Sequence, residues 1–362
     1  MKRITCFIAT LTCGGAEHQM VILIEMLLQK GYKIRLLNRG NTEDHYVLPD
    51  GVEREWIRNR GNIVARFWEH FKYFIRVKTD VVICFEQREN MFMLPAMFFR
   101  PKIKVIASER NLTYGKQNWK EKLLLKILYK RADYVVPNSV SQREHLLKYR
   151  PEWDKKIIAI NNYTDLSHYS YTPLPQNHRL RIGVFCRYAE QKNYKRFVEC
   201  ITKLKMIHGD KFVVEWYGKQ NDGEVFNEDY LKMRELVTKH NIQDCLILNN
   251  RINNVESVLP SFDAISVPSI YEGFSNSIAE SICCGRPVLA GNVSDNPIMI
   301  QDGINGFLFD PLNVDDMVDA FNKYLSLSKE ERNNLSIAAR KRAEELFDSE
   351  KFIQKYITLI ES

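Results

Sequence analysis

The chain has 362 residues, too many for one ordinary hydrophobic core, and this length favours two domains of roughly 170 residues each. Its 45% hydrophobic and 27% charged residues are typical of globular proteins, and no apolar run reaches the ~20 residues that a bilayer-spanning helix needs. The net charge of +7 is uneven, because residues 1–165 hold 29 Lys and Arg against 18 Asp and Glu, whereas the remainder holds 23 against 27.

Short apolar runs alternate with longer amphipathic stretches from end to end. The apolar start of the chain is soon interrupted by Gly14, Gly15 and Glu17, so we expect a buried first strand and not a signal peptide. Near-continuous apolar strands separated by helices indicate parallel sheets covered on both faces. Strands are expected at residues 4–11, 33–38, 81–85, 104–107, 134–137, 181–186, 212–217, 245–248, 264–268, 287–290 and 306–308, and helices at 20–28, 314–325, 329–347 and in the last piece to 360.

The segment 161–179 has neither helical nor strand periodicity, and it contains Pro173 and Pro175. We interpret it as the linker between two domains. The predicted fold is therefore α/β, with two Rossmann-like doubly wound domains that face each other across a cleft. The predicted bounds are 1–165 and 166–345, followed by a C-terminal helix over 346–362 that crosses back to the first domain. Ligands of such folds bind at the carboxyl ends of the strands, so motifs at strand ends are the candidate sites.

The excess of positive charge in the first half predicts attraction to an anionic surface or substrate. Residues 119–131 combine lysines with apolar residues at helical spacing. Two interpretations of this segment stay open: a basic helix that lies on a membrane, or a core helix with a lysine-rich solvent face. The basic segments belong to no nucleic-acid-binding motif, so nucleic acid is not an expected partner. Eight cysteines without a C-x-x-C pair predict reduced thiols in the cytosol.

Two glycines follow the first predicted strand, in Gly14-Gly15-Ala16-Glu17-His18, and lead into a helical pattern. Glycine lets the backbone approach a ligand closely, and free N–H groups at a helix N-terminus favour an anion. The alternative is an ordinary tight turn. The dinucleotide fingerprint G-x-G-x-x-G and the phosphate loop G-x-x-x-x-G-K-[ST] are both missing from the sequence, which argues against NAD and ATP.

In the second half, a predicted strand ends at Arg187, and Lys192 follows five residues later. Two cations at a strand end can hold a diphosphate and neutralise the charge that develops when it leaves. The alternative is a pair of surface basic residues.

The most informative segment is 268–287. A predicted strand ends there, Gly273 bends the chain, and Ser275 or its neighbour caps a short helix that stops at Gly285. The carboxylate of Glu280, on this helix, can accept hydrogen bonds from both ribose hydroxyls of a nucleotide. Glu272 lies on the loop before the helix. Taken separately, each acid could simply be solvated.

This segment resembles the Glu-x7-Glu motif of the family 4 retaining glycosyltransferases, which have the two-domain GT-B fold. Further stretches agree in order along nearly the whole chain. They are Gly14-Gly15-Ala16-Glu17, Ala132 to Val136 with Ser139, Ile160 to Asn162 with Asp165, Arg187 with Lys192-Asn193, and Asp302 to Phe307.

The resemblance implies an acceptor-binding first domain and a second domain that binds a nucleotide diphosphate sugar. Arg187 and Lys192 would then contact the donor diphosphate and Glu280 the ribose, while Glu272 would meet the sugar or its reacting face. Further donor contacts are implied for Gly15, Phe274, Ser275 and Asn276, so that Glu272, Arg187 and Lys192 form the catalytic set.

The family transfers with retention, and its leaving diphosphate helps to deprotonate the acceptor, so no protein base is required. The sequence contains no D-x-D, no H-E-x-x-H and no Cys/His ligand cluster, and we therefore expect neither a metal nor another cofactor.

Departures from the family pattern lie near the acceptor and the donor sugar. Many members have a histidine where this chain has Glu109 and Arg110, and either residue could meet the acceptor or simply cap a turn. His18 is a further acceptor-side candidate. Cys186 replaces the usual glycine before the donor-binding arginine, and Ile298 replaces a common glutamate.

The expected function is transfer of a sugar from a nucleotide diphosphate donor, UDP-hexose or UDP-N-acetylhexosamine, to a glycan or polyprenyl-linked acceptor in polysaccharide biosynthesis. The expected location is the cytoplasm, at the inner face of the cell membrane. The alternatives are a nucleotide-sugar epimerase of the same fold and a non-catalytic sugar-nucleotide-binding subunit.

Overall fold

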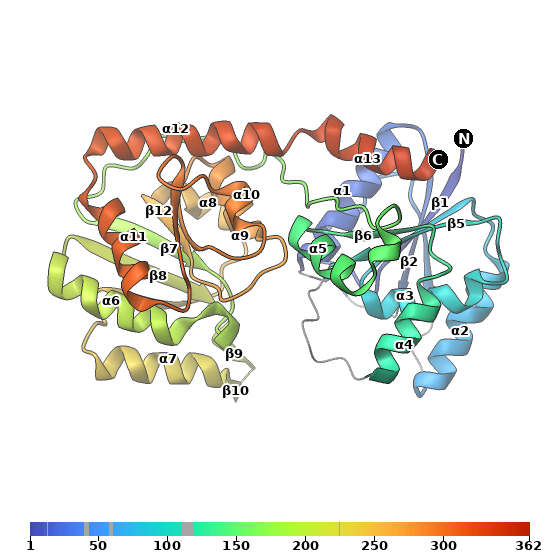
Figure 1. Cartoon of the computed structure of the whole chain (residues 1–362), viewed down its shortest axis with the longest axis horizontal. Coiled ribbons are helices and arrows are strands. Elements are labelled where there is room, and N and C mark those ends of the chain that lie inside the picture. The colour runs from blue at the N-terminus through green and yellow to red at the C-terminus, as the bar shows by residue number, and fades with distance from the viewer. Residues whose placement is uncertain (13, 40–42, 58–60, 111–118, 224) are drawn as a thin grey trace. The chain divides into compact units, whose positions relative to one another are not determined.

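The computed structural model describes the chain except residues 13, 40–42, 58–60, 111–118 and 224 (Figure 1). The described residues form two compact units. Unit 1 consists of residues 1–163 and 349–362, and unit 2 consists of residues 164–348. The sequence placed the corresponding boundaries after residues 165 and 345.

Unit 1 is built on a six-stranded sheet in which every pair of neighbouring strands is parallel, in the order β3-β2-β1-β4-β5-β6. Its elements are β1 (Arg3–Phe7), α1 (Gly15–Gln29), β2 (Lys33–Arg39), β3 (Glu53–Ile57), α2 (Ile63–Arg76), β4 (Val81–Phe85), α3 (Gln87–Met97), β5 (Lys104–Glu109), α4 (Trp119–Leu128), β6 (Tyr134–Pro137), α5 (Val140–Tyr149), η1 (Pro151–Trp153) and α13 (Ser349–Glu361).

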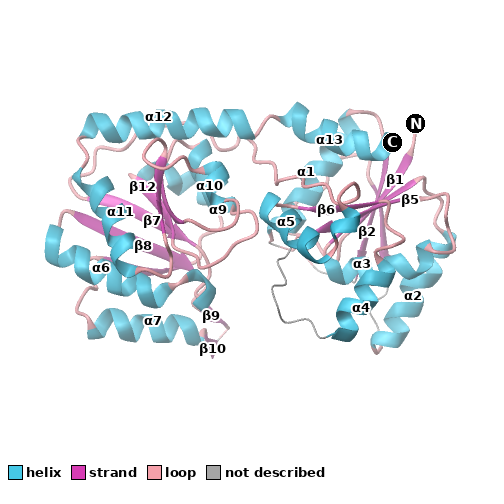
Figure 2. Ribbon diagram, in the orientation of Figure 1, coloured by secondary structure: helices cyan, strands magenta, loops and turns pink. Residues whose placement is uncertain are grey.

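Each face of this sheet has its own hydrophobic core, because alternate residues of a strand point to opposite faces. In β4, Ile83 and Phe85 belong to a core shared with α1 and α13, whereas Val82 and Cys84 belong to a core shared with α2 and α3. Both faces are therefore covered by helices, as the continuous apolar strands predicted (Figure 2).

The sequence did not predict β3, whose residues Glu53 to Ile57 include two glutamates and an arginine. It is one of the two edge strands of the described sheet and pairs only with β2 there. There Arg35 forms ion pairs with Glu53 at 2.9 Å and Glu55 at 3.1 Å. An edge strand with one solvated face keeps charged side chains, so the apolar pattern that marked the buried strands is missing.

Helix α13 belongs to unit 1 although it ends the chain. Its buried residues Phe352, Ile353, Tyr356, Leu359 and Ile360 join the core that contains α1. Their apolar side chains recur at helical spacing, which gives the helix one face for packing.

Unit 2 repeats the same plan with a parallel sheet in the order β11-β8-β7-β12-β13-β14 and a small hairpin of β9 and β10. Its elements are β7 (Leu180–Phe185), η2 (Glu190–Lys192), α6 (Tyr194–His208), β8 (Phe212–Gly218), β9 (Asn221–Asp222), β10 (Val225–Phe226), α7 (Glu228–Lys239), β11 (Leu246–Asn250), α8 (Val255–Val258), η3 (Leu259–Ser261), β12 (Ala264–Val267), α9 (Asn276–Cys283), β13 (Val288–Gly291), α10 (Asn296–Met299), β14 (Gly306–Phe309), α11 (Val314–Ser326) and α12 (Lys329–Leu346).

Both units thus have a doubly wound parallel sheet, and the predicted fold class is confirmed. In each sheet the strand order reverses beside the first strand, between β1 and β4 in unit 1 and between β7 and β12 in unit 2. Ligands of such folds bind at the carboxyl ends of the two strands that flank this switch point. The switch point of each unit is therefore where its site residues should lie.

All seven cysteines that the structure describes are free thiols, and six of them are buried. Cys13 lies outside the described residues.

Candidate functional site

The switch point of unit 2 collects most of the residues that the sequence singled out. Strand β7 leads into the segment that contains Arg187 and Lys192, and β12 leads into the loop that contains Glu272 and Ser275. Strands β7 and β12 are hydrogen-bonded neighbours, with Ala264 opposite Ile182. The two loops therefore leave the same edge of the sheet side by side.

Hydrogen bonds join these two loops. The amide of Gln191 donates to the carbonyl oxygen of Tyr271 at 2.8 Å, and the backbone N–H of Ile270 donates to the carbonyl of Gln191 at 2.9 Å. Ser294 also holds the loop, because its hydroxyl donates to the carbonyl of Glu272 at 2.6 Å. The loops are thus fixed relative to each other before any ligand binds.

Lys192 and Glu272 form an ion pair across the two loops, with 2.5 Å between Nζ and Oε1. Their side chains are only 15% and 11% exposed. A pair so poorly hydrated is costly to break by removing one partner, because the other charge is left uncompensated. Glu272 therefore holds the lysine ammonium at the end of the sheet.

Arg187 is exposed at the end of β7, and its guanidinium donates to the side-chain oxygen of Gln191 at 2.9 Å. Gln191 thus links the arginine to the loop that carries Glu272. Two cations from one strand end, one paired and one exposed, form an arrangement that can bind a diphosphate.

Helix α9 begins at the same edge. The hydroxyl of Ser277 donates to the carbonyl of Phe185 at 2.9 Å, which ties the first turn of the helix to the end of β7. Ser275 occupies the N-cap position, as predicted, but its side chain accepts no hydrogen bond from the helix. The positive end of the α9 dipole, at Asn276, therefore lies at this edge, where it favours an anion.

The helix ends where the sequence placed its end. The C-cap residue is Cys284, and Gly285 follows with a φ of 72°, a left-handed conformation that glycine adopts without strain. The ring of Phe274 is buried and lies 6.3 Å from the ring of Phe347. Its side chain is part of the packing of unit 2, so a donor contact at this position would come from its backbone.

Glu280 is half-buried on α9. Burial raises its pKa from 4.5 to about 7, and a hydrogen bond from the hydroxyl of Tyr169 opposes that rise. The carboxyl group therefore changes charge near neutral pH.

Sequence reasoning missed Tyr169, because it lies in the aperiodic segment that was interpreted as a linker. Gln191 was missed as well, since nothing in the sequence marks a residue that joins two loops.

In unit 1, the glycine pair stands where β1 runs into α1. Gly14 is the N-cap residue and Gly15 is the first residue of the helix. A Cβ atom on Gly14 would come close only to the carboxylate end of the flexible Glu17 side chain, which can move aside. His18 stacks on Tyr46, with ring centroids 5.0 Å apart and an interplanar angle of 5°. The histidine ring is therefore held in place by an aromatic neighbour.

Glu109 and Arg110 are both buried at the end of β5. The hydroxyl of Tyr129 donates to the Glu109 carboxyl group, whose pKa burial raises to about 8. Arg110 donates to Asn162 at 2.6 Å and to the hydroxyl of Tyr356 at 2.9 Å. Arg110 therefore joins the sheet to α13 inside unit 1, and its candidate acceptor role competes with a structural one.

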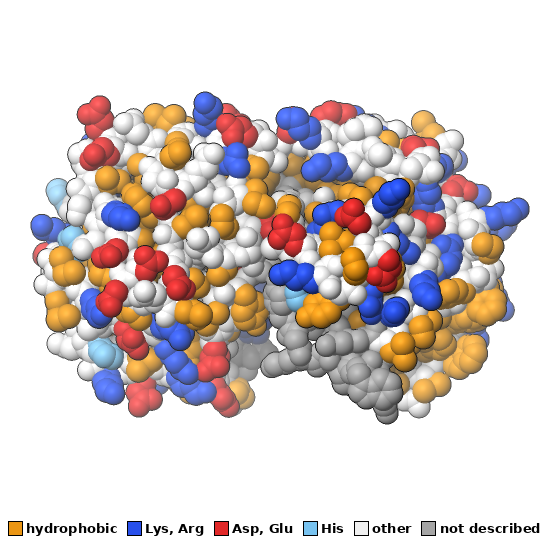
Figure 3. Space-filling view, viewed as in Figure 1, with side chains coloured by type: hydrophobic (Ala, Val, Ile, Leu, Met, Phe, Trp, Pro, Cys, Tyr) orange, Lys and Arg blue, Asp and Glu red, His pale blue; other side chains and the backbone are white. Residues whose placement is uncertain are grey.

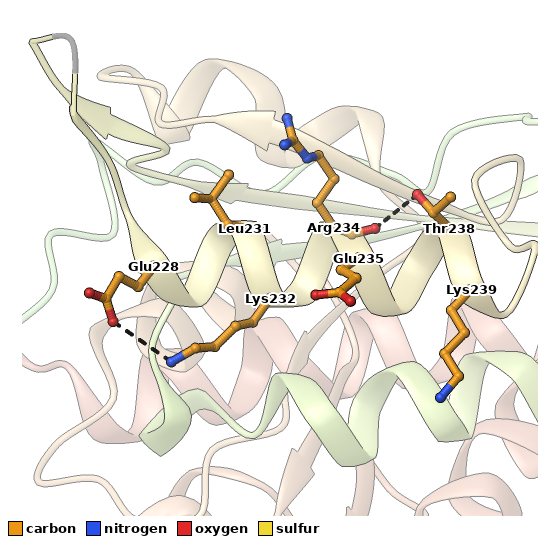
Figure 4. A pocket seen from close by; sticks show the side chains of 7 residues that line it. All are labelled: Glu228, Leu231, Lys232, Arg234, Glu235, Thr238 and Lys239. Atoms are coloured by element: carbon orange, nitrogen blue, oxygen red, sulfur yellow. Dashed lines mark hydrogen bonds and ion pairs between the residues drawn. The ribbon is translucent and has the colours of Figure 1, made fainter.

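Other features of the described chain do not add to this site. A groove of about 710 Å³ is lined by seven residues, but all of them belong to α7 (Figure 4). Within the described ranges, no group of three or more His, Cys, Asp and Glu residues is arranged to hold a metal ion. None of the helices in those ranges is both long and apolar enough to cross a bilayer.

Two family models match the chain. The model described as Glycosyltransferase Family 4 matches residues 13–168, and the model described as Glycosyl transferases group 1 matches residues 175–342. Together they cover most of both units.

A curated relative from Campylobacter jejuni is 24% identical over 309 residues, which are 80% of this chain and 80% of the relative. It is named N-acetylgalactosamine-N,N'-diacetylbacillosaminyl-diphospho-undecaprenol 4-alpha-N-acetylgalactosaminyltransferase. An Escherichia coli UDP-Gal:alpha-D-GlcNAc-diphosphoundecaprenol alpha-1,3-galactosyltransferase is 28% identical over 133 residues, 36% of this chain and 32% of that protein.

Among solved structures, Anabaena Alr3699/HepE in complex with UDP and glucose superimposes with a TM-score of 0.83. The alignment covers 100% of both chains at 15% identity, so it is a likeness of fold.

Proposed function

The chain belongs to the family 4 glycosyltransferases, and we propose that it moves a hexosyl or N-acetylhexosaminyl group from a UDP-sugar to a glycan or polyprenyl-linked acceptor. The observation that carries this proposal is the gathering of Arg187, Lys192, Glu272 and the start of α9 at the switch point of unit 2. The relatives add support, since two are named for action on diphospho-undecaprenol-linked sugars and the Anabaena protein was solved with UDP. The process we propose is biosynthesis of a capsular polysaccharide or exopolysaccharide.

Breaking the bond between the sugar and the diphosphate places negative charge on the leaving phosphate oxygen. In our proposal Arg187 and Lys192 neutralise that charge, and the positive end of the α9 dipole stabilises the same anion. These groups would supply the charge stabilisation without a metal ion or another cofactor.

The Lys192–Glu272 ion pair suggests how the site responds to the donor. The donor diphosphate would replace Glu272 as the ion-pair partner of Lys192. The Glu272 carboxylate could then accept hydrogen bonds from sugar hydroxyls. Glu280 would accept hydrogen bonds from the two ribose hydroxyls in its ionised form. The proposed catalytic residues are therefore Arg187, Lys192 and Glu272, and Glu280 binds the ribose of the donor.

We propose that transfer retains the anomeric configuration. The acceptor hydroxyl would attack from the side on which the diphosphate leaves, and the departing phosphate oxygen would take the acceptor proton. This route requires no carboxylate on the opposite side of the sugar as a nucleophile.

We further propose that the protein works at the inner face of the cell membrane. The excess of positive charge before residue 165 would draw it to anionic lipids, where a polyprenyl-linked acceptor would be held.

Calorimetry with UDP, GDP, ADP and TDP, each with and without EDTA, tests the donor site. We expect UDP to bind selectively and EDTA to have no effect. Lys192→Met should weaken UDP binding at least tenfold. Lys195→Met is the matched control, because Lys195 is three residues further on, 57% exposed and paired with Glu190. Equal binding by both variants would contradict the assignment.

Product analysis separates this function from its alternatives. With a UDP-sugar and a polyprenyl diphosphate-linked acceptor, a retaining transferase gives a new glycosidic bond with the anomeric configuration of the donor, which NMR resolves. Conversion of the donor sugar without an acceptor would indicate an epimerase. Binding of UDP without turnover of any donor would indicate a non-catalytic subunit.

A further inference from the structure

Helix α2 turns an apolar face toward solvent. Its inner side carries the buried residues His70 and Phe74. Its outer side exposes Ile63, Val64 and Trp68, which are 62%, 58% and 51% accessible. Isolated exposed apolar residues are common on protein surfaces, but a helix that gathers several on one side marks an interaction surface.

The exposed side of α2 continues into the turn after α3. Aromatic ring centroids lie 5.8 Å apart for Phe67 and Trp68, 5.5 Å for Trp68 and Phe71, and 5.7 Å for Phe71 and Phe99. Phe98 and Phe99 are themselves 46% and 69% exposed. We call this surface the α2 face. It consists of Ile63, Val64, Phe67, Trp68, Phe71, Phe98 and Phe99.

Helix α4 adds to the apolar area of unit 1. Leu123, Leu124 and Ile127 are exposed, whereas Leu128 is buried and packs toward the core. The side chains of residues 119–122 lie outside the described ones. Helices α2 and α4 both contact α3, and Figure 3 shows hydrophobic side chains gathered over both helices at the lower right.

Most charged residues in the segments that form this area are basic. Segments 63–76, 98–104 and 123–131 contain nine basic residues and one acidic residue, Glu69. The basic residues are Arg66, Lys72, Arg76, Arg100, Lys102, Lys104, Lys126, Lys130 and Arg131. Some of them have structural partners, since Arg100 donates to carbonyls at the end of α2, Lys72 pairs with Glu69 and Arg131 pairs with Asp133. Hydrogen bonds to carbonyl oxygens do not cancel a positive charge, so most of the excess persists.

We propose that the α2 face docks unit 1 on an anionic lipid bilayer, with its aromatic and aliphatic side chains at the interface between headgroups and acyl chains. Aromatic residues rimmed by lysine and arginine are the combination that such an interface binds. A second copy of the chain is a poorer occupant, because a two-fold contact would bring the same cationic patches together. The physiological purpose of this docking, access to a lipid-linked acceptor, rests on the proposed function.

Flotation of the full chain with vesicles tests the proposal. One set is phosphatidylcholine alone, and the other contains 30% phosphatidylglycerol, at low and high NaCl. We expect binding to the anionic vesicles that falls with salt. The fraction of the variant V64S/W68S/F99S that floats with the anionic vesicles should be at least fivefold smaller than that of the wild type. The matched control M206S/I207S removes exposed apolar residues of α6 in unit 2, which are 77% and 57% accessible, and should float like the wild type.

A second variant keeps the test independent of folding defects. The chain has five tryptophans, and brominated lipids quench those that reach the acyl region. Trp68→Phe should keep vesicle binding and lose most of this quenching. Unchanged quenching in Trp68→Phe, wild-type flotation of the triple variant, equal binding to both vesicle types, or a shift of oligomeric state on mutation would each overturn the proposal.

UDP calorimetry on the same samples separates the two hypotheses. The triple variant leaves every proposed donor residue in place, so its UDP affinity should equal that of the wild type. Vesicle binding without UDP binding would refute the donor assignment and leave the docking surface standing. UDP binding without vesicle binding would refute the docking surface and leave the donor assignment standing.

Discussion

Replacing Glu280 by glutamine should abolish the pH dependence that this residue gives to two properties, donor affinity and stability. The carboxyl group has a pKa of about 7, raised from 4.5 by burial. Ribose hydroxyls donate best to the ionised carboxylate, so donor binding should strengthen as pH rises and the group loses its proton. Below the pKa, each pH unit corresponds to a factor of up to ten in affinity.

The expected magnitude follows from that pKa. Between pH 8 and pH 5.5, the wild-type affinity for a UDP-sugar should fall roughly 30-fold, provided the bound form stays ionised. Hydrogen bonds to a charged acceptor contribute about 1.5–3 kcal/mol, and the glutamine variant loses this contribution. At pH 8, Glu280→Gln should therefore bind the UDP-sugar roughly 10- to 150-fold more weakly than the wild type. The affinity of Glu280→Gln should then be nearly independent of pH.

Stability should change in the opposite direction. Because the pKa of Glu280 is raised in the folded state, the stabilisation linked to its proton is present below about pH 4.5 and is lost as pH rises through about 7. Glu280→Gln should therefore be more stable than the wild type at pH 8, by up to roughly 3 kcal/mol, and similar to it at low pH.

Isothermal calorimetry with UDP-glucose and urea unfolding at pH 5.5, 7 and 8 measure the two effects. UDP-glucose is preferable to UDP because its diphosphate is esterified at both ends and does not titrate in this range. A wild-type affinity that does not change with pH would refute the reasoning. Equal affinities of Glu280→Gln and the wild type for UDP-glucose at pH 8 would also refute it.

Three other substitutions test separate contacts. Tyr169→Phe removes the hydrogen bond that favours the ionised form of Glu280, so the pH midpoint of UDP-glucose binding should move upward, and an unchanged midpoint would count against this contact. Arg110→Met should cost roughly 1–3 kcal/mol in urea unfolding, because Tyr356 loses its buried partner, while a raised acceptor KM at unchanged stability would favour an acceptor role instead. Gly306→Ala would force a Cβ atom against the backbone of β13 and should destabilise by about 1–3 kcal/mol, which a melting curve checks.

The sequence predicted the doubly wound domains because buried parallel strands carry continuous apolar runs, which differ clearly from the helices between them. It did not predict β3, whose charged residues suit a strand with one solvated side. It also gave the order of the site motifs, since glycine bends and strand ends have local signatures. For this reason the prediction for residues 268–287, a strand end, a bend and a short helix that stops at Gly285, is confirmed.

Pairings between distant residues were decided only by the tertiary structure. Lys192 meets Glu272 because β7 and β12 are neighbours in the sheet, although 80 positions separate the two residues. Nothing local predicts that Tyr169 donates to Glu280, or that Phe274 packs on Phe347. The burial of Arg110 and the exposure of the α2 face likewise depend on which elements pack against them. Local patterns fix the element and its ends, whereas burial, and with it pKa and exposure, depends on neighbours that the chain brings together only on folding.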